Sequence, residues 1–237
     1  MFTFFSGILW IYFIAAVLPA VILLGFVYRQ DKVEQEPIGL VISLLKYGVL
    51  AAVCSFIPEL IGESILPNFI SETSETYSIV LAFLVVAVVE EGFKFLFLYK
   101  RTWDDPNFNC RFDGIVYAVC VSLGFATIEN LEYVLGYGLA LAPARALLAI
   151  PGHLSFSVFM GVFYGYAKLK ADQGNGTSSR ISLIMAYLSA VLLHGFYDSC
   201  ALINTNTSNL YFIIFIIIMY VTVFMLIRHE SKNDRPI

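Results

Sequence analysis

The chain has 237 residues, of which 59% are hydrophobic and only 14% are charged. Soluble domains usually carry about 25% charged residues, so this composition excludes an ordinary water-soluble domain and indicates a membrane protein. The net charge of −4 says little about partners, and no nucleic acid is expected among them. The four cysteines have no CxxC spacing, which argues against a disulfide framework or a thiolate metal site.

Seven apolar stretches are each long enough to cross a bilayer, for which about 20 residues are needed. In chain order they are residues 3–28, 38–61, 78–99, 112–137, 147–168, 181–203 and 209–227. The first stretch lacks a basic n-region and exceeds the usual apolar core of a signal peptide, so we expect a retained helix. The connections are short and contain typical loop residues. The sequence therefore predicts an all-α polytopic membrane protein with about seven transmembrane helices in one bundle, as a single domain over residues 1–237.

Basic residues are distributed unequally between the two sides of the predicted bundle. Most of the 14 fall on one side: Arg29, Lys32, Lys100, Arg101, Arg111, Lys168, Lys170, Arg180, Arg228, Lys232 and Arg235. Arg145 falls on the other side, and Lys46 and Lys94 lie within spans. Because cytoplasmic loops are enriched in Lys and Arg, we expect the N-terminus outside and the C-terminus in the cytoplasm. Lys46 is expected to reach the cytoplasmic interface with its long side chain.

Several polar side chains lie inside these spans, where burying a charge is costly. They are Glu90, Glu91, Lys94, Asp113, Glu129, Asn130, Glu132, His153, His194 and Asp198. At a helical rise of 1.5 Å per residue, Glu129, His153 and His194 lie roughly 10–14 Å from the outer ends of their spans, and Glu90 lies roughly 18 Å in. Four helices therefore bring acid and imidazole groups to one layer in the outer half of the membrane. Asp113 is expected at the cytoplasmic interface as a helix-start residue, and Glu132 close to the outer surface.

Helical spacing relates these residues in pairs. Glu90 and Lys94 share a face, as do His194 and Asp198. Glu91 is turned by about 100° from Glu90, so the two glutamates cannot have the same environment. Each pair also has a structural interpretation, as an ion pair within one helix or as a polar contact between helices. Ionisable groups that converge from four helices are nevertheless candidates for function.

This set of residues favours hydrolysis. A buried glutamate can act as a general base toward water, and a histidine can stabilise the oxyanion or protonate the leaving amine. No serine or cysteine has an evident nucleophile setting, so activated water is preferred. Two other interpretations remain open: a proton relay or proton-coupled transporter that uses the same Glu/His cluster, and a scaffold that binds a partner helix. No internal repeat of the kind common in transporters is present.

Four segments carry most of these residues: "EEGFK" (90–94), "FDGIVYAVCVSLGFATIENLEY" (112–133), "HLSFSVFMG" (153–161) and "HGFYD" (194–198). In content and order they resemble the motifs of the PrsW family of bacterial intramembrane proteases, which is similar to the CAAX prenyl-protease and bacteriocin-immunity superfamily. The resemblance implies a protease with a motif-bearing core at 78–203, in the bacterial cell membrane. The implied substrate is a single-pass membrane protein, such as an anti-sigma factor, cut near its extracytoplasmic side.

The resemblance also implies roles for individual residues. The catalytic set is Glu90, Glu91, Glu129, His153, His194 and Asp198, and we expect Lys94 and Asn130 to support it. Glu90 would be the base that activates water, and the two histidines would bind water or stabilise the oxyanion. Members of the family are labelled metalloproteases, whereas the superfamily is also described as a glutamate type. A divalent metal such as zinc stays an open alternative, with Glu90, Glu129, His153 and His194 as candidate ligands.

Overall fold

The computed structural model describes the backbone of residues 2–237 and the side chains from Trp10 onward. Within this range the regular structure is helical, without a β-sheet. In chain order the elements are α1 (Phe2–Tyr28), α2 (Ile38–Ile65), η1 (Leu66–Asn68), α3 (Glu75–Val80), η2 (Leu81–Ala87), α4 (Val88–Thr102), α5 (Asp113–Tyr137), η3 (Leu139–Leu141), α6 (Ala142–Leu147), α7 (Ala149–Asp172), α8 (Gly176–Ile203) and α9 (Asn206–Lys232). The all-α prediction is confirmed.

Among the described residues, six helical segments are long and apolar enough to cross a membrane. They coincide with six of the seven predicted spans, and the protein is a polytopic membrane protein. The predicted span 78–99 lies in a continuous helical run formed by α3, η2 and α4. Its middle part, η2, is a π-helix, and its last part buries two glutamates and a lysine. Neighbouring helices shield these charges from lipid. The run can therefore lie in the bundle although it is not among the segments long and apolar enough to cross a membrane by themselves.

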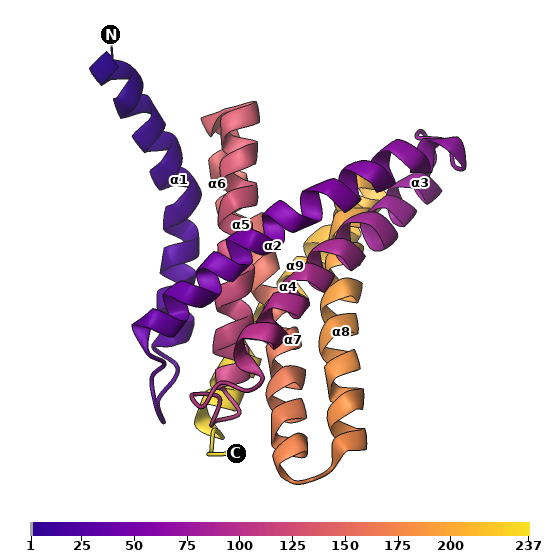
Figure 1. Cartoon of the computed structure of the whole chain (residues 1–237). Coiled ribbons are helices and arrows are strands. Elements are labelled where there is room, and N and C mark those ends of the chain that lie inside the picture. Colours follow the sequence, from indigo (N-terminus) through magenta and orange to yellow (C-terminus); the bar gives the residue numbers. More distant parts are fainter. Residues whose placement is uncertain (1) are drawn as a thin grey trace.

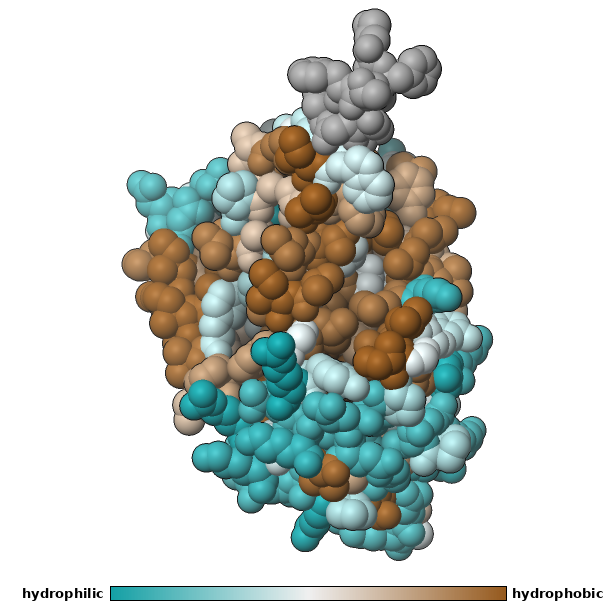
Figure 2. Space-filling model, turned by 90° about the vertical axis from the view of Figure 1, so that its left-hand side faces the viewer, coloured by the Kyte–Doolittle hydropathy of each residue, from teal (hydrophilic) through white to brown (hydrophobic). Residues whose placement is uncertain are grey.

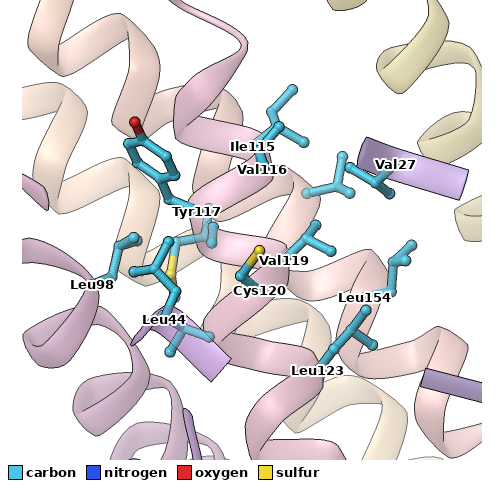
Figure 3. Close-up of a cluster of buried hydrophobic side chains, with 14 of the residues drawn as sticks. Val27, Leu44, Leu98, Ile115, Val116, Tyr117, Val119, Cys120, Leu123 and Leu154 are labelled. Atoms are coloured by element: carbon cyan, nitrogen blue, oxygen red, sulfur yellow. The ribbon is translucent and has the colours of Figure 1, made fainter. Parts of the chain in front are cut away.

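Helix α5 lies at the centre of the bundle. Residues 113–126 are buried without exception, and α5 contacts α1, α2, α4 and α7. Figure 3 shows side chains of α5, among them Tyr117 and Leu123, packed beside Leu44 of α2, Leu98 of α4 and Leu154 of α7. Because lipid is as apolar as leucine, close packing rather than exclusion from water stabilises such contacts. Tight packing around α5 therefore fixes the positions of the polar residues it carries.

Helices α5 and α7 approach each other closely because glycines face one another. A Cβ atom added to Gly161 would lie within 2.7 Å of the backbone of Gly114 and Ile115. A Cβ atom at Gly114 would likewise meet the backbone of Gly161 and Gly165. Small residues of this kind allow transmembrane helices to pack backbone against backbone.

We expect Gly161→Ala to lower the free energy of unfolding by about 1–3 kcal/mol, because the new methyl group forces the two backbones apart. Thermal unfolding of the protein in detergent would measure this loss. Gly136→Ala is the matched control, since a Cβ atom there meets nothing within 4 Å. Equal unfolding temperatures for the two variants would contradict the packing described here.

The polar connections lie mostly at one end of the bundle. Figure 1 shows the α1–α2, α4–α5 and α7–α8 connections and the C-terminus at the lower end of the molecule. The face in Figure 2 has a broad apolar band above a hydrophilic lower end. The eleven basic residues grouped in the sequence fall in these connections or in the adjoining ends of the helices. The structure therefore gathers positive charge at one end of the apolar band.

Candidate active site

The buried polar residues of α4, α5, α7 and α8 meet beside a cavity of about 660 Å³. Glu90, Glu129, His153, His194 and Asp198 all line this cavity. The predicted convergence of acid and imidazole groups from four helices is thus present. Of the other predicted site residues, Glu91, Lys94 and Asn130 are buried behind the cavity wall.

Lys94 connects the two glutamates of its own helix to α7. Its ammonium nitrogen lies 3.0 Å from Glu90 Oε2, 2.8 Å from Glu91 Oε1 and 3.2 Å from Nδ1 of His153. It also lies 3.9 Å from the centre of the Phe125 ring, a cation–π contact. The side chain is almost fully buried. An ammonium has three N–H donors, so these three polar contacts use all of them.

The contacts of His153 determine its tautomer. Because an ammonium can only donate, Nδ1 of His153 accepts from Lys94, and the ring proton is on Nε2. Nε2 lies 2.6 Å from Glu129 Oε2 and donates to it. Ser122 Oγ donates to the backbone carbonyl of His153 at 2.9 Å. His153 is therefore a neutral imidazole held between an ammonium and a carboxylate.

Arg145 of α6 is part of the site, although the sequence did not mark it as a candidate. Its guanidinium lies 3.0 Å from Glu129 Oε1 and 4.0 Å from the centre of the Tyr133 ring. Its Nε donates to Asn130 Oδ1 at 2.8 Å, and Asn130 Nδ2 donates to the carbonyl of Ala16 at 2.9 Å. The supporting position predicted for Asn130 is thus explained by its contact with Arg145. One feature of the sequence could have indicated Arg145: it is the one basic residue assigned to its side of the bundle.

His194 lies between two carboxylates. Nδ1 is 2.9 Å from Glu91 Oε1, and Nε2 is 3.2 Å from Asp198 Oδ2. The expected His194–Asp198 pair on one face of α8 is present. The ring stacks on Phe156 of α7, with 4.8 Å between the ring centres. Because an acceptor faces each nitrogen, this geometry favours the doubly protonated imidazolium.

Glu90 and Glu91 have different environments, as the helical spacing predicts. Glu91 is completely buried, and its Oε1 contacts both Lys94 and His194. Glu90 contacts Lys94 with one oxygen and lines the cavity. Glu90 can therefore meet a water or a substrate, whereas Glu91 holds Lys94 and His194 in place.

Nearby serine hydroxyls are engaged in their own helices. Ser155 donates to the carbonyl of Pro151 at 2.7 Å, and Ser157 donates to that of Leu154 at 2.8 Å. Neither residue lines the cavity. A hydroxyl used in this way is poorly placed to attack a substrate. The geometry therefore favours water as the nucleophile.

A metal was an open alternative for this cluster. One atom from each of Glu90, Glu91, His153 and His194 lies within 4.8 Å of the others, and carboxylate and imidazole are suitable zinc ligands. Lys94, however, contacts Glu90, Glu91 and His153 within 3.2 Å. A dication among these residues would lie beside an ammonium in a site with little water. Glu91 Oε2 is buried without a partner among the described residues, but one free oxygen does not make a metal site. As arranged, the residues do not fit a metal.

A bundle of apolar helices that encloses acids, imidazoles and a cavity defines a membrane-embedded enzyme equipped for hydrolysis. Comparisons with known proteins agree. Residues 36–227 match the family described as PrsW family intramembrane metalloprotease, and the chain belongs to this family. The resemblance noted in the four segments is confirmed.

Several curated relatives carry the name Protease PrsW. The protein from Geobacillus kaustophilus is 38% identical over 186 residues, which cover 78% of this chain and 76% of that protein. The protein from Clostridioides difficile is 34% identical over 214 residues, covering 88% and 86%, and that from Bacillus subtilis is 33% identical over 184 residues, covering 78% and 79%. No solved structure matches the chain significantly. The protein is therefore a bacterial integral membrane peptidase that acts on membrane proteins, which favours proteolysis over the transport and scaffold interpretations.

Proposed function

We propose that the chain, as a single domain, cleaves a peptide bond of a single-pass membrane protein with water activated by Glu90. The observation that carries this proposal is the division between the glutamates: Glu90 lines the cavity, and Glu91 is completely buried against Lys94 and His194. Glu129, His153 and Asp198 contribute further polar groups around the same space. The combination supplies a base, hydrogen-bond donors and room for a peptide.

In the proposed reaction, Glu90 takes a proton from water while the water oxygen attacks the scissile carbonyl carbon. The carbonyl π electrons move onto its oxygen, and the imidazolium of His194 or the guanidinium of Arg145 stabilises the resulting negative charge. The tetrahedral intermediate then collapses and breaks the carbon–nitrogen bond. Glu90 returns its proton to the leaving amine, which restores the enzyme and leaves a carboxylic acid and an amine as products.

We propose that Lys94 supplies the positive charge that a metal would otherwise bring. It lies 3.0 Å from Glu90 Oε2, where it favours the ionised form of the base and fixes its orientation. His153, which accepts from Lys94 and donates to Glu129, extends this support to α5. The proposal departs from the metalloprotease description of the family because the ammonium already occupies the position between the ligands.

The surroundings of the cavity support lateral entry of a substrate from lipid. A second cavity of about 270 Å³ lies between α2 and α5 and is lined by Phe56, Glu59 and Ile128. Both cavities share Glu90 and Glu129. A transmembrane segment that partly unwinds between α2 and α5 would bring its backbone to Glu90. An anti-sigma factor with one membrane anchor is a substrate of this kind.

The distribution of charge supports an orientation for cleavage. The end that holds the basic connections is proposed to face the cytoplasm, with the C-terminus there and the N-terminus outside. Residues Glu129 and Glu132, which line the cavity, lie in the half of α5 farther from that end. The cut would therefore fall near the extracytoplasmic side of the substrate.

A comparison of membrane proteomes tests the function. Cells with the wild-type enzyme are expected to contain one or a few single-pass proteins shortened near the extracytoplasmic side, and cells with Glu90→Gln at equal abundance are expected to contain their full-length forms. A set of shortened proteins that is identical in both cells would refute the proposal.

The same substrate, once found, allows a test of the metal. Cleavage by the purified enzyme is expected to continue at an unchanged rate in excess 1,10-phenanthroline, which removes zinc and other transition metals. Loss of activity in the chelator, with recovery on addition of zinc, would show that Lys94 does not replace a metal.

A further inference from the structure

A second group of buried carboxylates lies far from the cavity. Asp31 and Glu36 belong to the α1–α2 connection, and Asp113 is the first residue of α5. They are 2%, 4% and 1% exposed, respectively. Asp113 and Glu129 are 16 positions apart on α5, a distance of roughly 24 Å along the helix. This group is therefore separate from the site described above.

Two of the three carboxylates, those of Asp113 and Glu36, each have one oxygen that accepts hydrogen bonds from the protein. Asp113 Oδ2 accepts from the backbone N–H groups of Asn109 and Cys110, at 3.0 and 2.6 Å. Glu36 Oε1 accepts from the hydroxyl of Tyr117 at 2.8 Å. These contacts fix the orientation of two of the three side chains. The second oxygen of each of these two carboxylates is not used in these hydrogen bonds.

Four carboxylate oxygens in the group are buried without a hydrogen-bond partner among the described residues: both of Asp31, Oε2 of Glu36 and Oδ1 of Asp113. No Lys, Arg or His nitrogen of the described side chains forms an ion pair with these three residues. Burial, together with the charge of Asp234, raises the pKa of Asp31 to about 6. Burial and the charge of Asp31 act likewise on Glu36, whose pKa rises to about 7. Unpaired buried carboxylates are costly, so a bound positive charge would stabilise the group.

The spacing of the oxygens fits a cation. One oxygen from each of the three residues lies within 4.8 Å of the other two. Oxygens bound to Ca²⁺ lie 2.3–2.6 Å from the ion, so two of them can be separated by up to about 5 Å. An all-oxygen set of three carboxylates is typical of hard divalent cations and unsuited to soft metals.

We propose that Asp31, Glu36 and Asp113 bind a hard divalent cation, of the Ca²⁺ or Mg²⁺ type, that fastens the α1–α2 connection to the start of α5. The neighbouring contacts converge on the same place. Ser231 of α9 donates to the carbonyl of Gln30, and Asp234 accepts from the N–H of Phe112. The cation would complete this junction between the connection, α5 and the C-terminal segment, and its role would be structural.

The purified full-length protein in detergent, stripped of cations with EDTA and dialysed, tests the proposal. Ca²⁺ and Mg²⁺ are titrated separately, with binding measured by calorimetry and stability by thermal unfolding. We expect one of them to bind at one site per chain and, at 100 times its Kd, to raise the Tm by roughly 5–10 °C. The ion with the lower Kd identifies which cation the site prefers.

Variants locate the site. The double variant Asp31→Asn/Glu36→Gln is expected to lose at least tenfold in affinity and the associated rise in Tm. It should still fold, because the amides remove the repulsion that the cation offsets. Glu34→Gln, in the same connection but exposed, is the matched control and should bind normally. Glu90→Gln should also bind normally, which separates this site from the cavity.

Two results would overturn the proposal. The first is the absence of any Ca²⁺ or Mg²⁺ binding that the double variant removes, at millimolar cation. The second is a wild-type protein that unfolds at the same temperature with and without millimolar cation, while the double variant is at least as stable as the wild type. That result would mean that protons, rather than a metal, neutralise the three carboxylates.

Discussion

Glu90→Gln is expected to reduce kcat by roughly 10²–10⁴-fold while the protein stays folded and inserted, because the amide cannot accept a proton from water. The substitution keeps the size of the side chain and leaves an oxygen for the contact with Lys94. Single-turnover cleavage of the identified substrate by the purified variant would measure the loss. An unchanged rate would show that Glu90 is not the base.

Two matched variants make this result specific. Glu132→Gln removes a carboxylate from the same cavity at an exposed position and should change the rate only a few-fold. Glu91→Gln should instead reduce stability, because Glu91 is the buried partner of both Lys94 and His194. If Glu91→Gln were stable and inactive while Glu90→Gln kept its activity, the roles of the two glutamates would be reversed.

Lys94→Met is expected to cost about 3–5 kcal/mol of stability and to abolish activity, because it leaves two buried glutamates without their ammonium. The buried ion pairs at 3.0 and 2.8 Å are the source of this large effect. Thermal unfolding and the amount of inserted protein would measure it.

A second variant separates stability from chemistry. Lys94→Met combined with Glu91→Gln removes opposite charges together and should recover much of the stability. It should remain inactive, since Glu90 still lacks its cation. Full recovery of activity in the double variant would contradict the role proposed for Lys94. If Lys94→Met alone were as stable as the wild type, the ion pairs of Lys94 would not stabilise the folded protein.

Much of the fold and the site could be predicted from the sequence because both depend on local patterns. Apolar length predicted the helices, and spacing of four residues predicted the Glu90–Lys94 and His194–Asp198 contacts. The difference between Glu90 and Glu91 followed from their rotation about the helix axis. The approximate depth of each residue along its helix was sufficient to predict that acid and imidazole groups from four helices meet.

Other features could not be predicted because they depend on packing between distant segments. Arg145 reaches Glu129 only because α6 folds back over the end of α5. Asp31 and Glu36 belong to a charged connection that a sequence pattern would leave in water, yet the start of α5 and the C-terminal segment bury them. The hydrogen bond that Lys94 donates to His153 of α7 likewise joins residues 59 positions apart in the chain.

The π-helix η2 sets the direction in which Glu90, the proposed base, points. Its i→i+5 hydrogen bonds each span one residue more than those of an α-helix, so the residues after it are out of phase with those of α3. Phe83 of η2 also packs against Gly195, where an added Cβ atom would overlap its ring, directly beside His194. A sequence shortened by one residue between 81 and 87 would rotate Glu90 away from the cavity. It would also loosen the packing of Phe83 beside His194, so the length of this stretch is as strict a constraint as the identity of the acids.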